Sequence, residues 1–298
     1  AIHRLVSANR AGDTVIHVRP SMARFLTDLF PTTRAALSRR RSSPFTAARR
    51  VRGSSARFDI GVTLRNAYRA KILLFLAARA RLGSVGQGAA VLLSHGYEVD
   101  RSRHQVHDAD PALRTLGLEP VNPRWRPRLG EQSAGAGEKA WHAIGLEAGP
   151  TVGLAPGTAS GGAKRWNASQ FGELASALHR AGARPVVIIG PHEDHLAAQI
   201  VAASTCRPAV VGADLDVAGL AGVLHKMDVV VGIDSGPTHL AAAVGARVVA
   251  LFGPTPPART APLGDSSRVL DLGLDCAPCS QSICPLGHRE CMNGLSVG

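Results

Sequence analysis

The polar residues best suited to bind a phosphate follow a short apolar run in the second half of the sequence. Residues 151–155 precede the loop 156–166, which contains several glycines, Thr158 and Lys164. Glycines let backbone N–H groups approach an anion, and a hydroxyl and an ammonium group bind phosphate oxygens. The spacing differs from that of a Walker A loop. The loop is therefore either a phosphate-binding loop or a plain strand-to-helix turn with an exposed lysine.

A second group of polar residues follows the apolar run 229–233. It consists of Asp234, Ser235, Gly236 and His239, at the predicted start of a helix. Ligands of open α/β sheets bind outside the carboxyl ends of the strands, and a helix N-terminus favours diphosphate oxygens. We expect a ligand site here. The alternative is that Asp234 only caps the helix and that His239 is an ordinary residue of its first turn.

Two further turns repeat this pattern. The run Phe252-Gly-Pro-Thr255 follows another apolar segment, and Glu193 follows the apolar run 185–189. A carboxylate in that position could accept hydrogen bonds from ribose hydroxyls. Polar or glycine-rich turns after four strands of one domain indicate a nucleotide site more firmly than any one of them alone.

These turns require a sheet that brings the strand ends together. Apolar strands alternate with helices throughout the second half, which is typical of a parallel sheet covered on both faces. The predicted strands are 151–155, 185–189, 209–211, 229–233 and 248–252. The first of the helices between them should begin at Asn167 or Ser169 and end at Gly182.

The sequence predicts an α/β protein of two domains. Residues 148–298 form a Rossmann-like domain, residues 120–147 are rich in Pro, Arg, Gly and Ala and form a linker, and residues 1–119 form the other domain. Within this first domain the pattern is weaker. Leu5-Val6 and 58–64 are predicted as strands and 70–80 as a helix.

Composition limits the class of partner. The 298 residues include 34 Lys and Arg against 22 Asp and Glu, so the net charge is +12, whereas aromatic residues make up only 4%. This composition excludes a disordered polymer and disfavours a base-stacking platform, and it indicates an anionic partner. Eight of the arginines lie in residues 34–57, which contain no acidic residue. This segment is either a solvated basic loop or a patch that faces an acceptor or a membrane.

Four of the five cysteines lie close together near residue 280. They are Cys276, Cys279, Cys284 and Cys291. With His288, this spacing can supply four tetrahedral ligands to a structural zinc ion. Reduced thiols or a disulfide-tied loop would have the same spacing. No catalytic role is expected for this cluster.

The sequence predicts a cytosolic protein. It contains no run of 18 uncharged apolar residues, and residues 1–6 lack the pattern of a signal peptide. Peripheral attachment to a membrane remains compatible with the basic charge.

The motifs together resemble the heptosyltransferases of glycosyltransferase family 9, which build the inner core of lipopolysaccharide. The resemblance rests on residues 154–178, on Asp234-Ser-Gly-x-x-His239, on Leu251-Phe-Gly-Pro-Thr255 and on the cysteine-rich segment. It is strong over 151–298, moderate over 58–118 and weak before residue 58. It implies a GT-B fold, in which two Rossmann-like domains face each other across a cleft.

The resemblance also implies roles for the candidate residues. Thr158 and Lys164 would hold the diphosphate of an ADP-heptose donor, Glu193 its ribose, and the group from Asp234 to His239 the sugar–diphosphate region. The family needs no catalytic metal. Its catalytic aspartate follows the first strand in a Gly-Asp pair, which Gly12-Asp13 matches. Asp13 would then deprotonate a hydroxyl of the acceptor with inversion at the anomeric carbon.

The implied partners are ADP-heptose, a lipid-linked lipopolysaccharide inner core and the inner face of the inner membrane. Nucleic acid is not expected, because no nucleic-acid motif occurs and the basic residues lack interleaved aromatics. Two departures from the family pattern keep alternatives open. Residues 13–58 are short for the family, so that Gly12-Asp13 could instead be a turn before a strand over 14–18, and Pro256-Pro257 stands where an aspartate is common. The chain could also use another nucleotide sugar, or bind nucleotide or membrane without catalysis.

Overall fold

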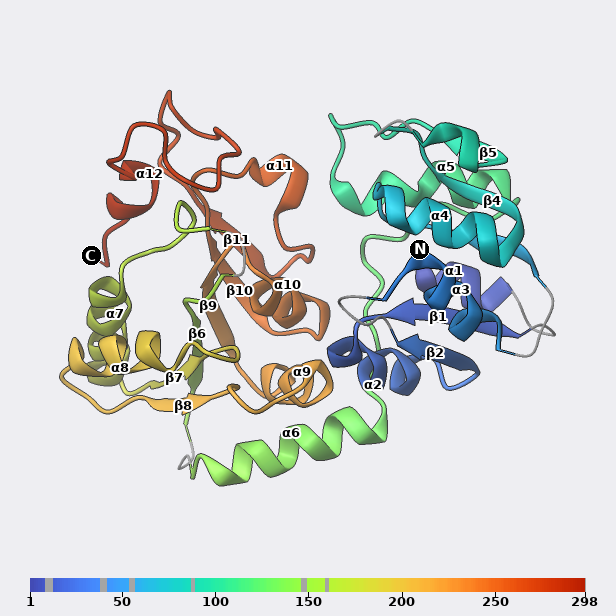
Figure 1. Cartoon of the computed structure of the whole chain (residues 1–298). Helices are drawn as coiled ribbons and strands as arrows, with labels where there is room; N and C mark the ends of the chain where they lie inside the picture. The colour runs from blue at the N-terminus through green and yellow to red at the C-terminus, as the bar shows by residue number, and fades with distance from the viewer. Residues whose placement is uncertain are drawn as a thin grey trace. The chain divides into compact units, whose positions relative to one another are not determined.

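The computed structural model describes residues 1–8, 13–37, 42–53, 57–86, 89–145, 149–158 and 161–297 (Figure 1). The chain divides into two compact units, Ala1–Asn122 and Pro123–Gly298. Every strand pair in the described residues is parallel, and helices connect most of the strands. The predicted α/β class is confirmed.

The second unit contains a six-stranded parallel sheet in the order β11-β10-β9-β6-β7-β8. Its strands are β6 (Thr151–Ala155), β7 (Arg184–Ile188), β8 (Ala209–Val211), β9 (Val229–Ile233), β10 (Arg247–Leu251) and β11 (Ser267–Leu270). The five strands predicted in this half match five of these to within one residue. Each central strand is an almost uninterrupted apolar run because both faces of the sheet are covered by helices.

Helices flank this sheet on both sides, with α7 and α8 on one and α9 and α10 on the other (Figure 1). The helices of this unit are α6 (Glu131–Ala143), α7 (Ala168–Arg180), α8 (Asp194–Ala202), α9 (Val217–His225), α10 (Gly236–Ala243), α11 (Pro257–Thr260) and α12 (Glu290–Asn293). Helix α7 begins as predicted, since Asn167 and Gln170 form a capping box. It ends before Gly182, whose φ of 80° is the left-handed conformation that glycine favours.

Helix α6 lies within the stretch 120–147 and packs against α9. The two helices approach at Gly137 and Gly222, where a Cβ atom on either residue would collide with the backbone of the other helix. Only glycine at both positions permits this close crossing.

The order of the strands reverses direction once in the second unit. From β6 the chain passes to β7 and β8 on one side, and it returns to β9 on the other side. The carboxyl ends of β6 and β9 are therefore neighbours whose following loops diverge to opposite faces. Such a topological switch point is where open α/β sheets bind their ligands.

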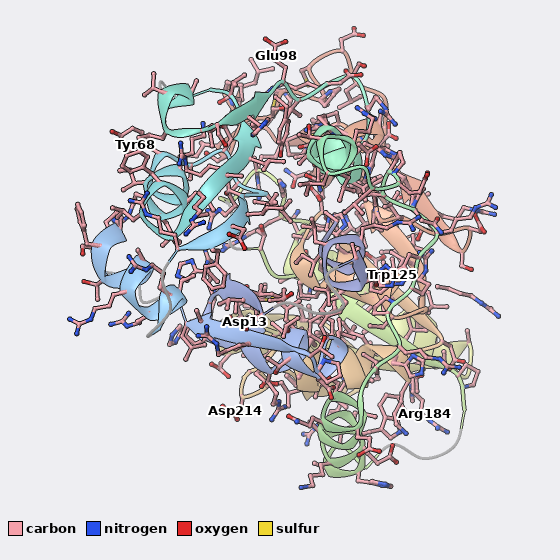
Figure 2. All side chains as sticks on the ribbon, turned by 90° about the vertical axis from the view of Figure 1, so that its right-hand side faces the viewer. Asp13, Tyr68, Glu98, Trp125, Arg184 and Asp214 are labelled. Atoms are coloured by element: carbon pink, nitrogen blue, oxygen red, sulfur yellow. The ribbon has the colours of Figure 1, made fainter. Side chains whose placement is uncertain are left out.

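The first unit also alternates strands and helices. Its strands form two parallel groups in the described residues, β1-β2 and β3-β4-β5. The elements are α1 (Ile2–Ala8), β1 (Thr14–Val18), α2 (Pro20–Leu29), β2 (Thr33–Leu37), α3 (Pro44–Arg52), β3 (Phe58–Val62), α4 (Tyr68–Ala77), β4 (Ala78–Ser84), β5 (His95–Tyr97) and α5 (Asp110–Thr115), with short 3₁₀ turns at Ala90–Leu92 and Gln105–Ala109. Tyr68, at the start of α4, projects outward from the helix (Figure 2).

One prediction for this unit is wrong, and one of the two alternatives for another segment is excluded. Leu5-Val6 is not a strand but part of α1, where Leu5 N–H donates to the Ala1 carbonyl at 3.1 Å. An isolated pair of apolar residues does not define a period, so it cannot distinguish strand from helix. The arginine-rich segment 34–57 is not simply a loop, because it contains most of β2 and all of α3.

Local sequence explains helix α3. The Ser43 hydroxyl accepts from the Thr46 N–H at 3.2 Å, and Pro44 occupies the first helical position. The small apolar residues Ala47, Ala48 and Val51 are buried, so the arginines of this helix lie on its other sides. Arg39, Arg40 and Arg41 lie outside the described residues.

Candidate functional site

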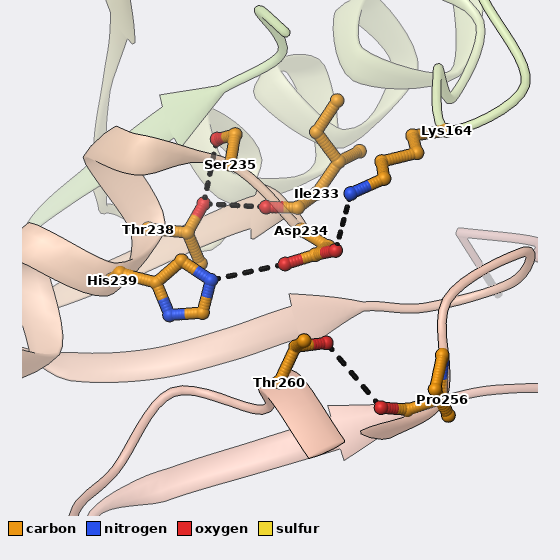
Figure 3. Close-up of polar contacts among 8 residues, drawn as sticks. All are labelled: Lys164, Ile233, Asp234, Ser235, Thr238, His239, Pro256 and Thr260. Carbon is orange, nitrogen blue, oxygen red and sulfur yellow. Dashed lines mark hydrogen bonds and ion pairs between the residues drawn. The ribbon is translucent and has the colours of Figure 1, made fainter. Parts of the chain in front are cut away.

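Three side chains meet at the switch point of the second unit (Figure 3). Asp234 is the first residue after β9. Its Oδ2 lies 2.6 Å from Lys164 Nζ, and its Oδ1 lies 3.0 Å from His239 Nε2. The structure thus joins a residue of the loop after β6 to the turn after β9 and the first turns of α10, as the candidate site requires.

The turn that holds Asp234 is tightly packed. Thr238 Oγ1 donates to the Ile233 carbonyl at 2.7 Å and lies 3.2 Å from Ser235 Oγ. A Cβ atom on Gly232 would collide with the Thr238 hydroxyl and with Ala155 of β6. Ser235 has extended backbone as the N-cap of α10, which leaves the amide of Gly236 at the positive end of the helix.

The electrostatics of Asp234 favour its charged form. Its side chain is 6% exposed. Burial raises the pKa of this carboxyl, but hydrogen bonds from His239 and Lys164 outweigh burial and lower the pKa to about 2. Because the ionised carboxylate only accepts, His239 Nε2 carries the proton in this contact.

Thr158 and Glu193 belong to neighbouring strand ends of the same edge. Glu193 Oε2 accepts from the Gly190 N–H at 2.7 Å, which fixes the carboxylate beside the end of β7. A Cβ atom on Gly157 would collide with that carboxylate, so Glu193 lies directly against the loop that carries Thr158. All the residues proposed for the donor therefore lie at the carboxyl edge of one sheet.

Sequence reasoning missed the role of residues 282–295, which hold the loop after β6 in place. Ala163 N–H donates to the Ser282 carbonyl at 3.1 Å, and Arg289 Nη1 donates to the Gly162 carbonyl at 3.4 Å. Trp166 Nε1 donates to the Leu295 carbonyl at 2.9 Å. A tryptophan in a polar loop was the one available signal, since a buried indole N–H requires an acceptor.

The cysteine-rich segment does not have the geometry of a zinc site. All five cysteines are described and are free thiols. Burial raises the pKa of the Cys291 thiol, and the neighbouring Cys276, Cys279 and Cys284 raise it further. Within the part of the chain that the structure describes, no three His, Cys, Asp or Glu side chains are arranged to hold a metal ion. The predicted structural zinc is therefore not supported.

Asp13 belongs to the first unit and immediately precedes β1. Its Oδ2 lies 3.3 Å from Arg34 Nη2, and its side chain is 55% exposed. The expected strand before it is absent from the described residues 1–8, so the alternative position, directly before a strand over 14–18, is the observed one. Gly12 lies outside the described residues. The catalytic role of Asp13 stays a prediction.

Comparison with known proteins gives consistent matches. Residues 47–289 match the model of glycosyltransferase family 9 (heptosyltransferase). Lipooligosaccharide heptosyltransferase 2 of Campylobacter jejuni is 33% identical over 150 residues, which are 48% of this chain and 46% of that protein. The chain thus spans about half the length of the curated relatives that it matches.

Two solved structures share the fold. A glycosyltransferase family 9 protein from Veillonella parvula has a TM-score of 0.85 and 19% identity, covering 99% of this chain and 88% of that one. The structure described as E. coli ADP-heptose lps heptosyltransferase II has a TM-score of 0.76 and 23% identity, covering 91% and 84%. Both neighbours have the GT-B fold class predicted above. With a family match over most of its length, the chain belongs to glycosyltransferase family 9.

Proposed function

We propose that this chain transfers heptose from ADP-heptose to the inner core of lipopolysaccharide, with inversion at the anomeric carbon. The observation that carries the proposal is the contact of Lys164 and His239 with one buried carboxylate, Asp234, at the switch point between β6 and β9. This arrangement combines an ammonium group, an imidazole and a helix N-terminus at one place, which suits the diphosphate of a nucleotide sugar.

The donor lies along the carboxyl edge of the six-stranded sheet. Thr158 and Lys164 bind the diphosphate, since an ammonium group has three donors and Asp234 uses one of them. Glu193 binds the ribose through the oxygen that does not accept from Gly190. Ser235 and Gly236, at the start of α10, contact the sugar–diphosphate region together with His239.

The acceptor is bound by the first unit. A hydroxyl of the acceptor attacks the anomeric carbon of heptose, the new C–O bond forms as the bond to the diphosphate oxygen breaks, and the Asp13 carboxylate takes the proton. Because attack and departure occur on opposite sides, the configuration inverts. Arg34 holds the Asp13 carboxylate from one side.

Cationic groups and amides stabilise the departing ADP. Charge develops on the diphosphate as the bond breaks, and Lys164 together with the N-terminus of α10 offsets it within a partly buried site. Catalysis in this scheme requires no cofactor. The expected check is full activity in the presence of a chelator.

Thermal shift and turnover test the proposal separately. We expect ADP and ADP-heptose to raise the melting temperature of the chain, and Lys164→Met to abolish most of that shift. We expect transfer to an acceptor with a truncated inner core, and its loss in Asp13→Asn. Absence of any stabilisation by ADP would show that the donor site is wrongly assigned.

A second candidate function has a specific observation in its favour. Asp13 precedes β1 and is paired with Arg34, which also suits a structural ion pair. A chain that binds ADP but transfers no heptose would be a non-catalytic member of the family. If the chain instead turns over a different nucleotide sugar, the residues assigned to the nucleotide diphosphate stay the same and only the identity of the transferred sugar changes.

The acceptor places the reaction at the inner face of the inner membrane, where the chain acts as a peripheral protein. No helix in the described part of the chain is long and apolar enough to cross a membrane. Cell fractionation, with salt extraction of the membrane pellet, measures this localisation directly.

A further inference from the structure

Helices α3 and α4 pack against each other and present an exposed face of unusual composition. The chain has only 12 aromatic residues, and three of them on these two helices are exposed: Phe45 by 69%, Tyr68 by 51% and Phe75 by 40%. Large aromatic side chains are normally buried in a core. Three exposed rings on one helix pair therefore require an explanation.

The spacing of residues on each helix separates this face from the core. Phe45, Arg49 and Arg52 are spaced i, i+4 and i+7 on α3, and Tyr68 and Phe75 are spaced i and i+7 on α4. The opposite sides of the helices are buried in one apolar cluster, formed by Ala48, Val51 and Ala77 with Leu73 and Leu76 packed against it. The aromatic rings are thus not unused core residues.

The two helix starts lie next to each other. Arg69 Nη2 donates to the Ser42 carbonyl, two residues before α3, at 2.5 Å. This contact brings the start of α4, with Tyr68, beside the start of α3, with Phe45. Tyr68 points away from the neighbouring strands (Figure 2).

The charge of this face has one sign. Helices α3 and α4 contain five basic residues and no acidic one, and only Lys71 among the five is fully buried. Asp59, on the adjacent strand β3, lies 3.8 Å from Arg79 and is offset by it. We propose that the α3–α4 face, defined by Phe45, Arg49, Arg52, Tyr68 and Phe75, binds the surface of an anionic phospholipid bilayer.

The chemistry of the face favours lipid over other anions. Aromatic rings enter the boundary between headgroups and acyl chains, and arginines beside them contact lipid phosphates. Binding of nucleic acid is dominated by charge and does not require exposed Phe45. The inference rests on the proposed function in one respect, since a lipid-linked acceptor would bring the chain to a membrane. Binding to lipid itself requires neither the donor nor the acceptor.

Vesicle co-sedimentation of the full chain tests the proposal. We expect binding to vesicles of phosphatidylcholine with phosphatidylglycerol, weakening with salt, and little binding to phosphatidylcholine alone. Arg49→Gln should lower the partition coefficient by about fivefold. Phe45→Ser with Tyr68→Ser should lower it by about tenfold or more, since both rings are exposed and their replacement leaves the core intact.

Val91→Ser is the matched control, because Val91 is 87% exposed in the same unit but lies outside this face. The proposal is overturned if this control weakens binding as much as the paired substitution, or if neutral and anionic vesicles bind equally. It is also overturned if the chain binds no vesicles. Loss of duplex DNA binding or of self-association in the same variants would then identify the occupant of this face. Thermal stabilisation by ADP, measured on the same samples, reports on the donor site independently.

Discussion

Lys164 Nζ lies 2.6 Å from Asp234 Oδ2, although the two residues are 70 positions apart in the sequence. The contact joins the loop after β6 to the turn after β9, and His239 binds the other oxygen of the same carboxylate. It orients the ammonium group and holds the two loops at a fixed separation. Both the proposed donor site and the packing of these two loops therefore depend on one carboxylate.

Asp234→Asn should destabilise the second unit at neutral pH by about 2 kcal/mol, from the difference between pKa values of 3.8 and about 2. The folded-state pKa is lowered, so the stabilisation is present above the unfolded value. It is lost as the pH falls from about 4 through about 2. Urea unfolding at several pH values measures the difference between the variant and the unchanged chain. A difference that stays constant down to pH 2 would contradict the assignment.

Lys164→Met should weaken ADP binding by about 10- to 100-fold, because a charge-assisted hydrogen bond contributes about 1.5–3 kcal/mol. Isothermal titration with ADP measures the affinity. Arg165→Met is the matched control, since Arg165 carries the same charge, is the adjacent residue and is exposed. Equal losses in the two variants would mean that only the general positive field, and not the ammonium of Lys164, attracts the nucleotide.

Trp166→Ala should cost about 3–5 kcal/mol, and Trp166→Phe about 1–2 kcal/mol. The indole is buried, packs edge-on against Phe171 at 4.8 Å and donates to the Leu295 carbonyl. Phenylalanine keeps part of the ring contact and loses the donor, whereas alanine loses both. Chemical denaturation measures the two losses, and an equal cost would show that the hydrogen bond outweighs the packing.

Lys71→Ala should destabilise the first unit by about 2–4 kcal/mol, whereas Lys71→Met should cost less than about 1.5 kcal/mol. Lys71 is fully buried in α4, and its Nζ donates to Asn66 Oδ1 at 2.9 Å and to the Gly86 carbonyl at 2.6 Å. Methionine keeps the apolar stem and removes a charge that must be desolvated. If the two variants unfold at the same urea concentration, the ammonium and not the stem provides the stabilisation.

The sequence predicts the second unit well because its strands are apolar throughout and its turns are polar. Asn167 and Gly182 bound α7 as expected, and the four polar strand ends lie at one edge of the sheet. What could not be predicted is contact between distant residues. The pairing of Lys164 with Asp234 depends on the strand order, which local pattern does not contain.

The first unit was harder to predict for a different reason. Its helix α3 carries three arginines and buries only small residues, so its apolar stripe is too narrow to distinguish a helix from a basic loop. The role of Lys71 was equally hidden, since a lysine in a helix is normally exposed. The buried residues of α3 and the ammonium group of Lys71 contact partners outside their own helix. The local sequence gives no sign of these partners.

The contacts of Ser282, Arg289 and Leu295 with the loop after β6 have a consequence for biosynthesis. A ribosome exposes β6 long before it has made residues 282–295, so the nascent loop has no partner for Ala163 or for the indole of Trp166. The loop of the proposed donor site therefore reaches its final packing only after these C-terminal residues have been made.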